Sequence, residues 1–181
     1  MGHSFGCNSL LPYITGQIKG VYLESYGNAE LSDSKHVCFD YHFIINVYLA
    51  NHGAATTIEQ FKLILKIGER SYDGERERDS HDVREGEKDW RAWGAGELDD
   101  LEKSNDAPLE HTRNGWLWIV VKGIPSADYK SEMKLELYVL DKDGISYKLD
   151  TLPQSQWQQN PFLRKAMREQ VRARMREQFS L

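Results

Sequence analysis

The sequence has little of what marks several large classes of protein. It contains only two cysteines, Cys7 and Cys38, in 181 residues, which is too few for a disulfide framework. No apolar run approaches the roughly 20 residues that a membrane-spanning helix requires. The first residues lack the basic and apolar regions of a signal peptide, so the sequence favours a cytoplasmic location.

Catalytic signatures are also missing. The sequence has no GxSxG, HExxH, CxxC, P-loop or dinucleotide-binding pattern, each of which would set a nucleophile, metal ligands or a phosphate cradle at a defined spacing. Neighbouring carboxylates such as Asp99 and Asp100 occur in a polar stretch that does not predict the burial a catalytic pair needs. We therefore expect a protein that is not an enzyme and carries no cofactor or metal, with a hydrolase as the weakest alternative.

What the sequence does contain is a long alternating stretch at residues 36–51. Large apolar side chains occupy every second position and so share one face of an extended strand. They are Phe39, Tyr41, Phe43, Ile45, Val47 and Leu49. Burying each one is worth roughly 1.5–3 kcal/mol, and no helical face in the chain offers a comparable apolar area. The stretch therefore predicts a sandwich, in which a second apolar sheet packs on this strand.

Five further strands are predicted by similar patterns, at residues 17–24, 57–67, 116–121, 133–139 and 145–149. Residues 141–144, Asp-Lys-Asp-Gly, form the turn between the last two. They resemble the opening of a calcium loop, but the downstream glutamate is missing and a strand resumes at once, so we interpret them as a tight turn.

The fold class that follows is all-β. We predict an immunoglobulin-like or fibronectin-like antiparallel β-sandwich of about seven strands at residues 17–152, with an irregular N-terminal arm at residues 1–16. Residues 69–110 are an acidic insertion with 15 Asp/Glu against seven Lys/Arg. Because a structureless loop of this length is unusual in a compact domain, short strands or a helical turn near residues 97–103 should interrupt it.

Two tryptophans, Trp90 and Trp93, are the large apolar anchors of the acidic insertion. We interpret them as pinning the insertion to the sandwich. The alternative is that they stack against a ligand, which would make the protein a carbohydrate-binding or small-ligand-binding sandwich.

Metal-ligand residue types recur at every second position of the central stretch, as His36, Cys38, Asp40 and His42. Residues two apart on a strand are about 7 Å apart, so at most two of the four could reach one ion. We therefore interpret them as the solvent face of a half-buried strand rather than as a zinc site.

The end of the chain changes character after a polar linker at residues 153–159. Asn160 is a good N-cap, Pro161 suits the first helical position, and strong helix formers follow, so residues 160–181 predict an amphipathic helix. Its basic ridge consists of Arg164, Arg168, Arg172 and Arg176, and the adjoining apolar ridge of Leu163, Met167, Val171, Met175 and Phe179.

Charge separates this helix from the rest of the chain. Residues 161–181 carry six Lys/Arg against two Asp/Glu, so this tail has a charge of +4 and the remainder of the chain −9. Arginines repeated every four residues repel one another, so the row indicates an acidic neighbour, in the chain's own acidic insertion or in a partner. Nucleic acid or an anionic membrane is less favoured, because the body lacks an extended basic face.

These observations predict a protein-interaction or accessory module that binds a protein partner or forms a homo-oligomer. The contacts would come from an exposed sheet face, the basic C-terminal helix or both. On the helix, the expected partner-binding residues are the four arginines of the basic ridge with Met167, Val171 and Met175. The alternative is that the helix docks on its own sandwich or pairs with a copy of itself.

Overall fold

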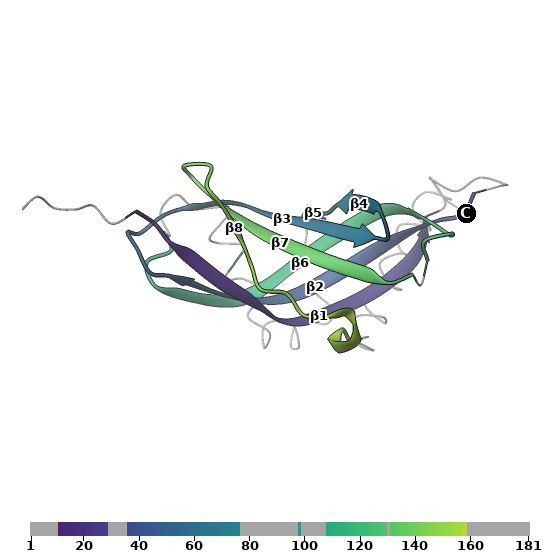
Figure 1. The fold of residues 1–181 in the computed structure, drawn as a ribbon, viewed down its shortest axis with the longest axis horizontal. Coiled ribbons are helices and arrows are strands. Elements are labelled where there is room, and N and C mark those ends of the chain that lie inside the picture. The colour runs from purple at the N-terminus through teal and green to yellow at the C-terminus, as the bar shows by residue number, and fades with distance from the viewer. Residues whose placement is uncertain (1–10, 29–35, 77–97, 99–107, 130, 159–181) are drawn as a thin grey trace, which may run out of the picture.

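The computed structural model describes residues 11–28, 36–76, 98, 108–129 and 131–158 (Figure 1). These residues form eight β-strands in two four-stranded sheets, followed by one short 3₁₀ turn, η2 (Gln154–Gln156). The prediction of an all-β, antiparallel fold is confirmed. The proposed C-terminal helix, Trp90 and Trp93 lie outside the described residues.

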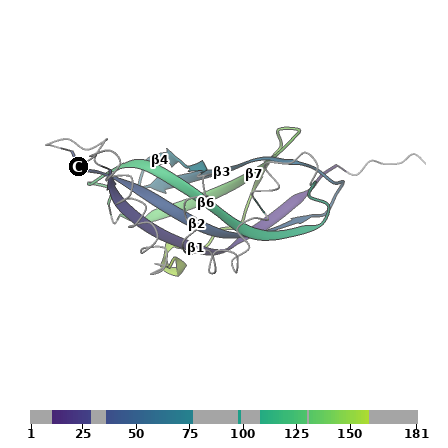
Figure 2. The ribbon, with the colours of Figure 1, turned by 180° about the vertical axis from the view of Figure 1, so that it is seen from behind.

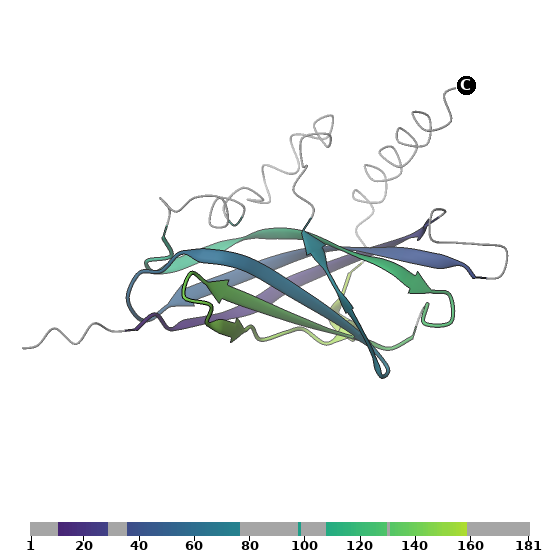
Figure 3. The ribbon, with the colours of Figure 1, turned by 90° about the horizontal axis from the view of Figure 1, so that it is seen from above.

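The first sheet contains the strands in the order β1-β2-β6-β5. Its members are β1 (Ile14–Asn28), β2 (Cys38–Asn51), β6 (Thr112–Pro125) and the two-residue β5 (Glu75–Arg76). The second sheet has the order β4-β3-β7-β8. Its members are β4 (Arg70–Asp73), β3 (Ile58–Ile67), β7 (Met133–Asp141) and β8 (Ser146–Lys148). Figures 1 and 2 show the two sides of the molecule, and Figure 3 shows both sheets from above.

The core lies between the two sheets, as the alternation predicts. On β2, Tyr41, Phe43, Ile45, Val47 and Leu49 are all buried. They belong to one hydrophobic cluster with Phe61, Leu63, Leu65 and Ile67 of β3. Phe39, the sixth apolar residue of the β2 series, is half-buried and stacks on Tyr129, with ring centroids 4.2 Å apart. The prediction that a second apolar sheet packs on this strand is therefore confirmed.

The chain crosses between the sheets on both sides of the sandwich. On one side, β4 of the second sheet runs through Gly74 into β5 of the first sheet, and the Gly74 N–H donates to the Leu63 carbonyl at 2.9 Å. On the other side, β8 pairs with β7, and Asp150 then hydrogen-bonds to Gly16 and Ile18 of β1. The two short strands β4 and β5 lie at the start of the predicted acidic insertion, whereas residues 97–103, apart from Leu98, lie outside the described residues.

Substituting Gly74 by alanine is expected to reduce the free energy of unfolding by about 1–3 kcal/mol, the usual cost of overpacking a tight core. A Cβ atom at this position would lie 2.5 Å from Ile119 Cγ2 and 3.0 Å from Leu63 Cδ2. Gly27→Ala is the matched control, because a Cβ atom there meets nothing within 4 Å. Urea unfolding of both variants checks this, and equal stabilities would show that the crossing tolerates a side chain.

The residues after β8 lie against β1. Gln158 donates its N–H to the Val21 carbonyl at 2.8 Å and accepts from the Leu23 N–H at 3.0 Å. Trp157 contacts the core, with its ring 5.8 Å from that of Phe43 in an edge-to-face arrangement. Gln158, within the predicted linker, is thus paired with the first sheet, and β1 itself begins at Ile14, inside the predicted arm.

The turn between β7 and β8 is the tight turn that the sequence predicts. The fully buried Asp141 accepts hydrogen bonds from the Asp143 and Ile145 N–H groups through Oδ1. Gly144 has a φ of 76°, a conformation that favours glycine. The Asp141 carboxylate is thus used to hold the turn together.

Candidate functional site

The side of the first sheet that faces away from the core carries large apolar side chains. Register pairs Tyr22 of β1 with Ile44 of β2, and Ile44 with Trp118 of β6. Ile44 is 1 % exposed, and the neighbours packed against it are half-buried. We call this surface the aromatic face, defined by Tyr22, Tyr26, Ile44, Trp116 and Trp118.

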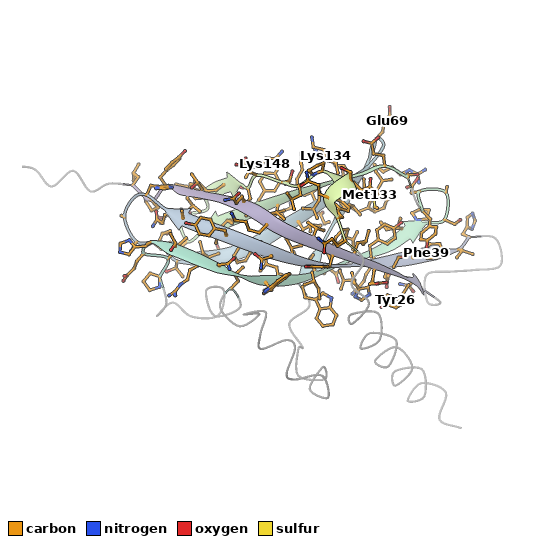
Figure 4. All side chains as sticks on the ribbon, turned by 90° about the horizontal axis from the view of Figure 1, so that it is seen from below. Tyr26, Phe39, Glu69, Met133, Lys134 and Lys148 are labelled. Carbon is orange, nitrogen blue, oxygen red and sulfur yellow. The ribbon has the colours of Figure 1, made fainter. Side chains whose placement is uncertain are left out.

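The rings of the aromatic face contact one another and His42. Tyr22 and Trp116 have ring centroids 5.7 Å apart, and Tyr26 meets His42 edge to face at 5.2 Å. His42 also lies 6.2 Å from the Trp118 ring. Figure 4 labels Tyr26 on this side of the molecule and Lys134 and Lys148 on the opposite side. The face is therefore a continuous platform of aromatic groups across three strands.

This arrangement differs from an ordinary two-layer sandwich, in which the outer face of each sheet is polar. Sequence reasoning missed it, because it treated the second side of β2 as a solvent face. A signal was present: residues 116–121 are apolar without interruption, and Ile44 and Ile45 are adjacent. A continuous apolar run in a strand is typical of burial on both faces.

The four metal-ligand residue types of the central stretch have separate surroundings. Asp40 accepts hydrogen bonds from Asn28 Nδ2 at 2.9 Å and from the Gly123 N–H at 3.0 Å. It thereby joins three strands next to the register shift between Phe39 and Tyr41. His36 is exposed, whereas His42 packs among the aromatic rings. Within the described part of the chain, no group of three His, Cys, Asp or Glu residues is placed to hold a metal ion.

The outer face of the second sheet is different, because it is built from lysines around one carboxylate. Glu136 of β7 is paired with Lys148 at 2.7 Å and with Lys66 at 2.9 Å, and Tyr138 donates to it at 3.1 Å. The Glu136 side chain is only 5 % exposed. These hydrogen bonds, those from Lys148 foremost and then Lys66, lower the pKa of Glu136 to about 2. The carboxylate thus links β3, β7 and β8 as a charged cross-strand cluster.

This cluster predicts a pH dependence of stability. Because the pKa of Glu136 is about 2 in the folded state, against an ordinary 4.5, its contribution is complete above pH 4.5 and is lost as the pH falls towards 2. Glu136→Gln is expected to lower the free energy of unfolding by about 1–2 kcal/mol at pH 7. Urea unfolding of both proteins between pH 7 and pH 2.5 should show this difference shrinking, and a constant difference would contradict the assignment.

The residues that the sequence singled out for partner binding and ligand stacking are not placed by the structure. The four arginines of the basic ridge, Met167, Val171, Met175, Trp90 and Trp93 all lie outside the described residues. The aromatic face is therefore the main candidate site within the described part of the chain, and none of its five defining residues was among those predictions.

Comparisons with known proteins add no assignment. The chain matches no protein-family model, no curated protein and no solved structure. Among the described residues, no helix is both long and apolar enough to cross a membrane. The function must therefore be argued from the surface chemistry of the sandwich itself.

Proposed function

We propose that this protein is a non-enzymatic interaction module that binds another protein, or a second copy of itself, through the aromatic face together with the basic C-terminal segment. The observation that carries the proposal is the apolar character of the outer side of the first sheet. On that side Tyr22, Tyr26, Trp116 and Trp118 are half-buried around the buried Ile44, so part of each ring is at the surface. Aromatic side chains gathered at the surface of an outer sheet face favour a role in recognition.

The chemistry of the face suits a protein partner. Tyrosine and tryptophan bury a large area with few rotatable bonds, and they are enriched at the centres of protein interfaces. Trp116, Trp118 and Tyr22 come from two different strands of a rigid sheet, so little ordering is needed on binding.

The strand order supports an immunoglobulin-like architecture for the module. If the eight strands are lettered A, B, C, C′, D, E, F and G along the chain, the first sheet reads A-B-E-D and the second C′-C-F-G. The A-B-E-D sheet is that of immunoglobulin domains, and a C′ strand beside the C-F-G sheet occurs in their variable type. Because this fold hosts many functions, it supports the architecture and not the choice of partner.

Affinity capture with surface variants tests the proposal. The full chain is immobilised and incubated with an extract of the source cells, alongside Trp116→Ser and Trp118→Ser. The expected result is a specific set of captured proteins, or self-association in sedimentation, that both variants lose. Lys134→Ser, on the outer side of the second sheet, is the control that should retain it. Identical capture by all four proteins would contradict the proposal, provided that thermal unfolding shows each variant to be folded.

A carbohydrate or another small ligand is the second candidate, favoured by the neighbouring rings of Tyr22 and Trp116. Titration with glycans should then shift the intrinsic tryptophan fluorescence, and Trp116→Ala should abolish the shift. If the binding tryptophans are instead those of the acidic insertion, Trp90→Ala or Trp93→Ala would abolish it.

A further inference from the structure

The described chain ends at the edge of the aromatic face. Both backbone hydrogen bonds of Gln158 are made to β1, to Val21 and to Leu23. These two residues flank Tyr22, which belongs to the aromatic face. The position where the sequence predicts a helix to begin, Asn160, is therefore only two residues from a point fixed beside this face.

The dimensions of the predicted helix fit the face. Its apolar ridge runs from Leu163 to Phe179, about 24 Å at the rise of an α-helix. On the sheet, Asn46 pairs with Gly20 on one side and with Trp116 on the other, so Trp116 lies at the level of Gly20. The apolar surface therefore extends from the level of Gly20 to that of Tyr26, which is about 20 Å along a strand. A helix laid along the strands could thus place about 20 Å of its apolar ridge on the face.

Three carboxylates lie on this side of the first sheet, two of them largely enclosed: Glu24 is 8 % exposed, and Asp40 accepts from Asn28 Nδ2 and the Gly123 N–H. Glu24 of β1 and Asp40 of β2 are on the same side of the sheet as the aromatic rings, where their register partners are His42 and Tyr26. Glu75 of β5, with its side chain 68 % exposed, is the third carboxylate, at the far edge, where it is paired with Lys122 at 2.6 Å. Arginines that adjoin an apolar ridge would be brought beside these acidic groups when the ridge contacts the rings.

We infer that residues 160–181 dock as an amphipathic helix on the aromatic face of their own chain. A two-residue tether gives the helix an effective concentration in the millimolar range, so the intramolecular contact forms before any contact with a second copy. The inference rests on the proposed function for its consequence: a partner that binds the aromatic face meets the docked segment at the same site.

Site-specific photo-crosslinking in the full chain tests the docking. A photoreactive amino acid is placed at Met167, on the apolar ridge, and in a second protein at Glu169, on the opposite side of the helix. The expected result is an intramolecular crosslink from position 167 to peptides that contain Tyr22, Ile44 or Trp118, and no such crosslink from position 169. Mixing isotopically labelled and unlabelled protein distinguishes contacts within one chain from contacts between copies.

Three outcomes would overturn the inference: crosslinks between labelled and unlabelled copies only, equal crosslinks from both positions, or none to these peptides. Failure of the docking is distinguishable from failure of the proposed function. If position 167 does not crosslink to the face while Trp116→Ser still abolishes partner capture, the helix does not dock and the proposed function stands. If it crosslinks but the surface variants leave capture unchanged, the docking stands and the proposed function fails.

Discussion

Replacing Phe43 by alanine is expected to lower the free energy of unfolding by about 3–5 kcal/mol, a large share of the stability of a domain of this size. Phe43 is fully buried at the middle of β2 and contacts Tyr41 and Trp157 edge to face. Its removal loses apolar burial and leaves a cavity that the rigid sheets cannot fill. Urea unfolding of the variant measures the loss.

Phe39→Ala is the matched control, because Phe39 lies on the same strand and the same side but is half-buried. Its expected cost is about half that of Phe43→Ala, since the lost burial scales with the apolar area removed from water. Equal costs at the two positions would contradict the placement of the core centre at Phe43.

Ile44→Ala is expected to cost about 2–4 kcal/mol, although Ile44 points away from the inter-sheet core. The reason is its burial among Tyr22, Tyr26, Trp116 and Trp118. In a sandwich with a solvated outer face the same substitution would change stability by less than about 1 kcal/mol. Chemical unfolding of this variant therefore tests whether the first sheet is apolar on both sides.

Ile64→Ala provides the comparison for Ile44→Ala. Ile64 lies on the outer side of the second sheet, opposite Glu136, and is only half-buried. A smaller loss than for Ile44 is expected, because less apolar area becomes exposed. A loss at Ile64 equal to or larger than that at Ile44 would mean that the two outer faces do not differ in the way the structure indicates.

The inter-sheet core could be predicted from the sequence because it depends on local alternation. Every second residue of β2 from Tyr41 to Leu49 is buried, and the same holds for Phe61 to Ile67 of β3. A period of two fixes both the strand and its buried side. The β7–β8 hairpin was equally accessible, since Asp141 and Gly144 are turn residues between two alternating stretches.

The candidate site could not be predicted in the same way. The aromatic face depends on which strands are neighbours: Tyr22, Ile44 and Trp118 come together through the order β1-β2-β6. Strand order is set by long-range pairing, which local periodicity does not report. The pairing of Gln158 with β1 was missed for a related reason. A short polar segment is typical of a linker, but here the backbone of Gln158 hydrogen-bonds to β1 at the edge of the first sheet.

The central claim is that the aromatic face is the binding surface of the module. The most direct test places a photoreactive amino acid at Tyr48, on the same side of the first sheet, and at Lys134, on the outer side of the second sheet, in cells that express the full chain. The account predicts covalent adducts with another protein chain from position 48 and none from position 134. Adducts from position 134 alone, or the same adducts from both positions, would contradict it.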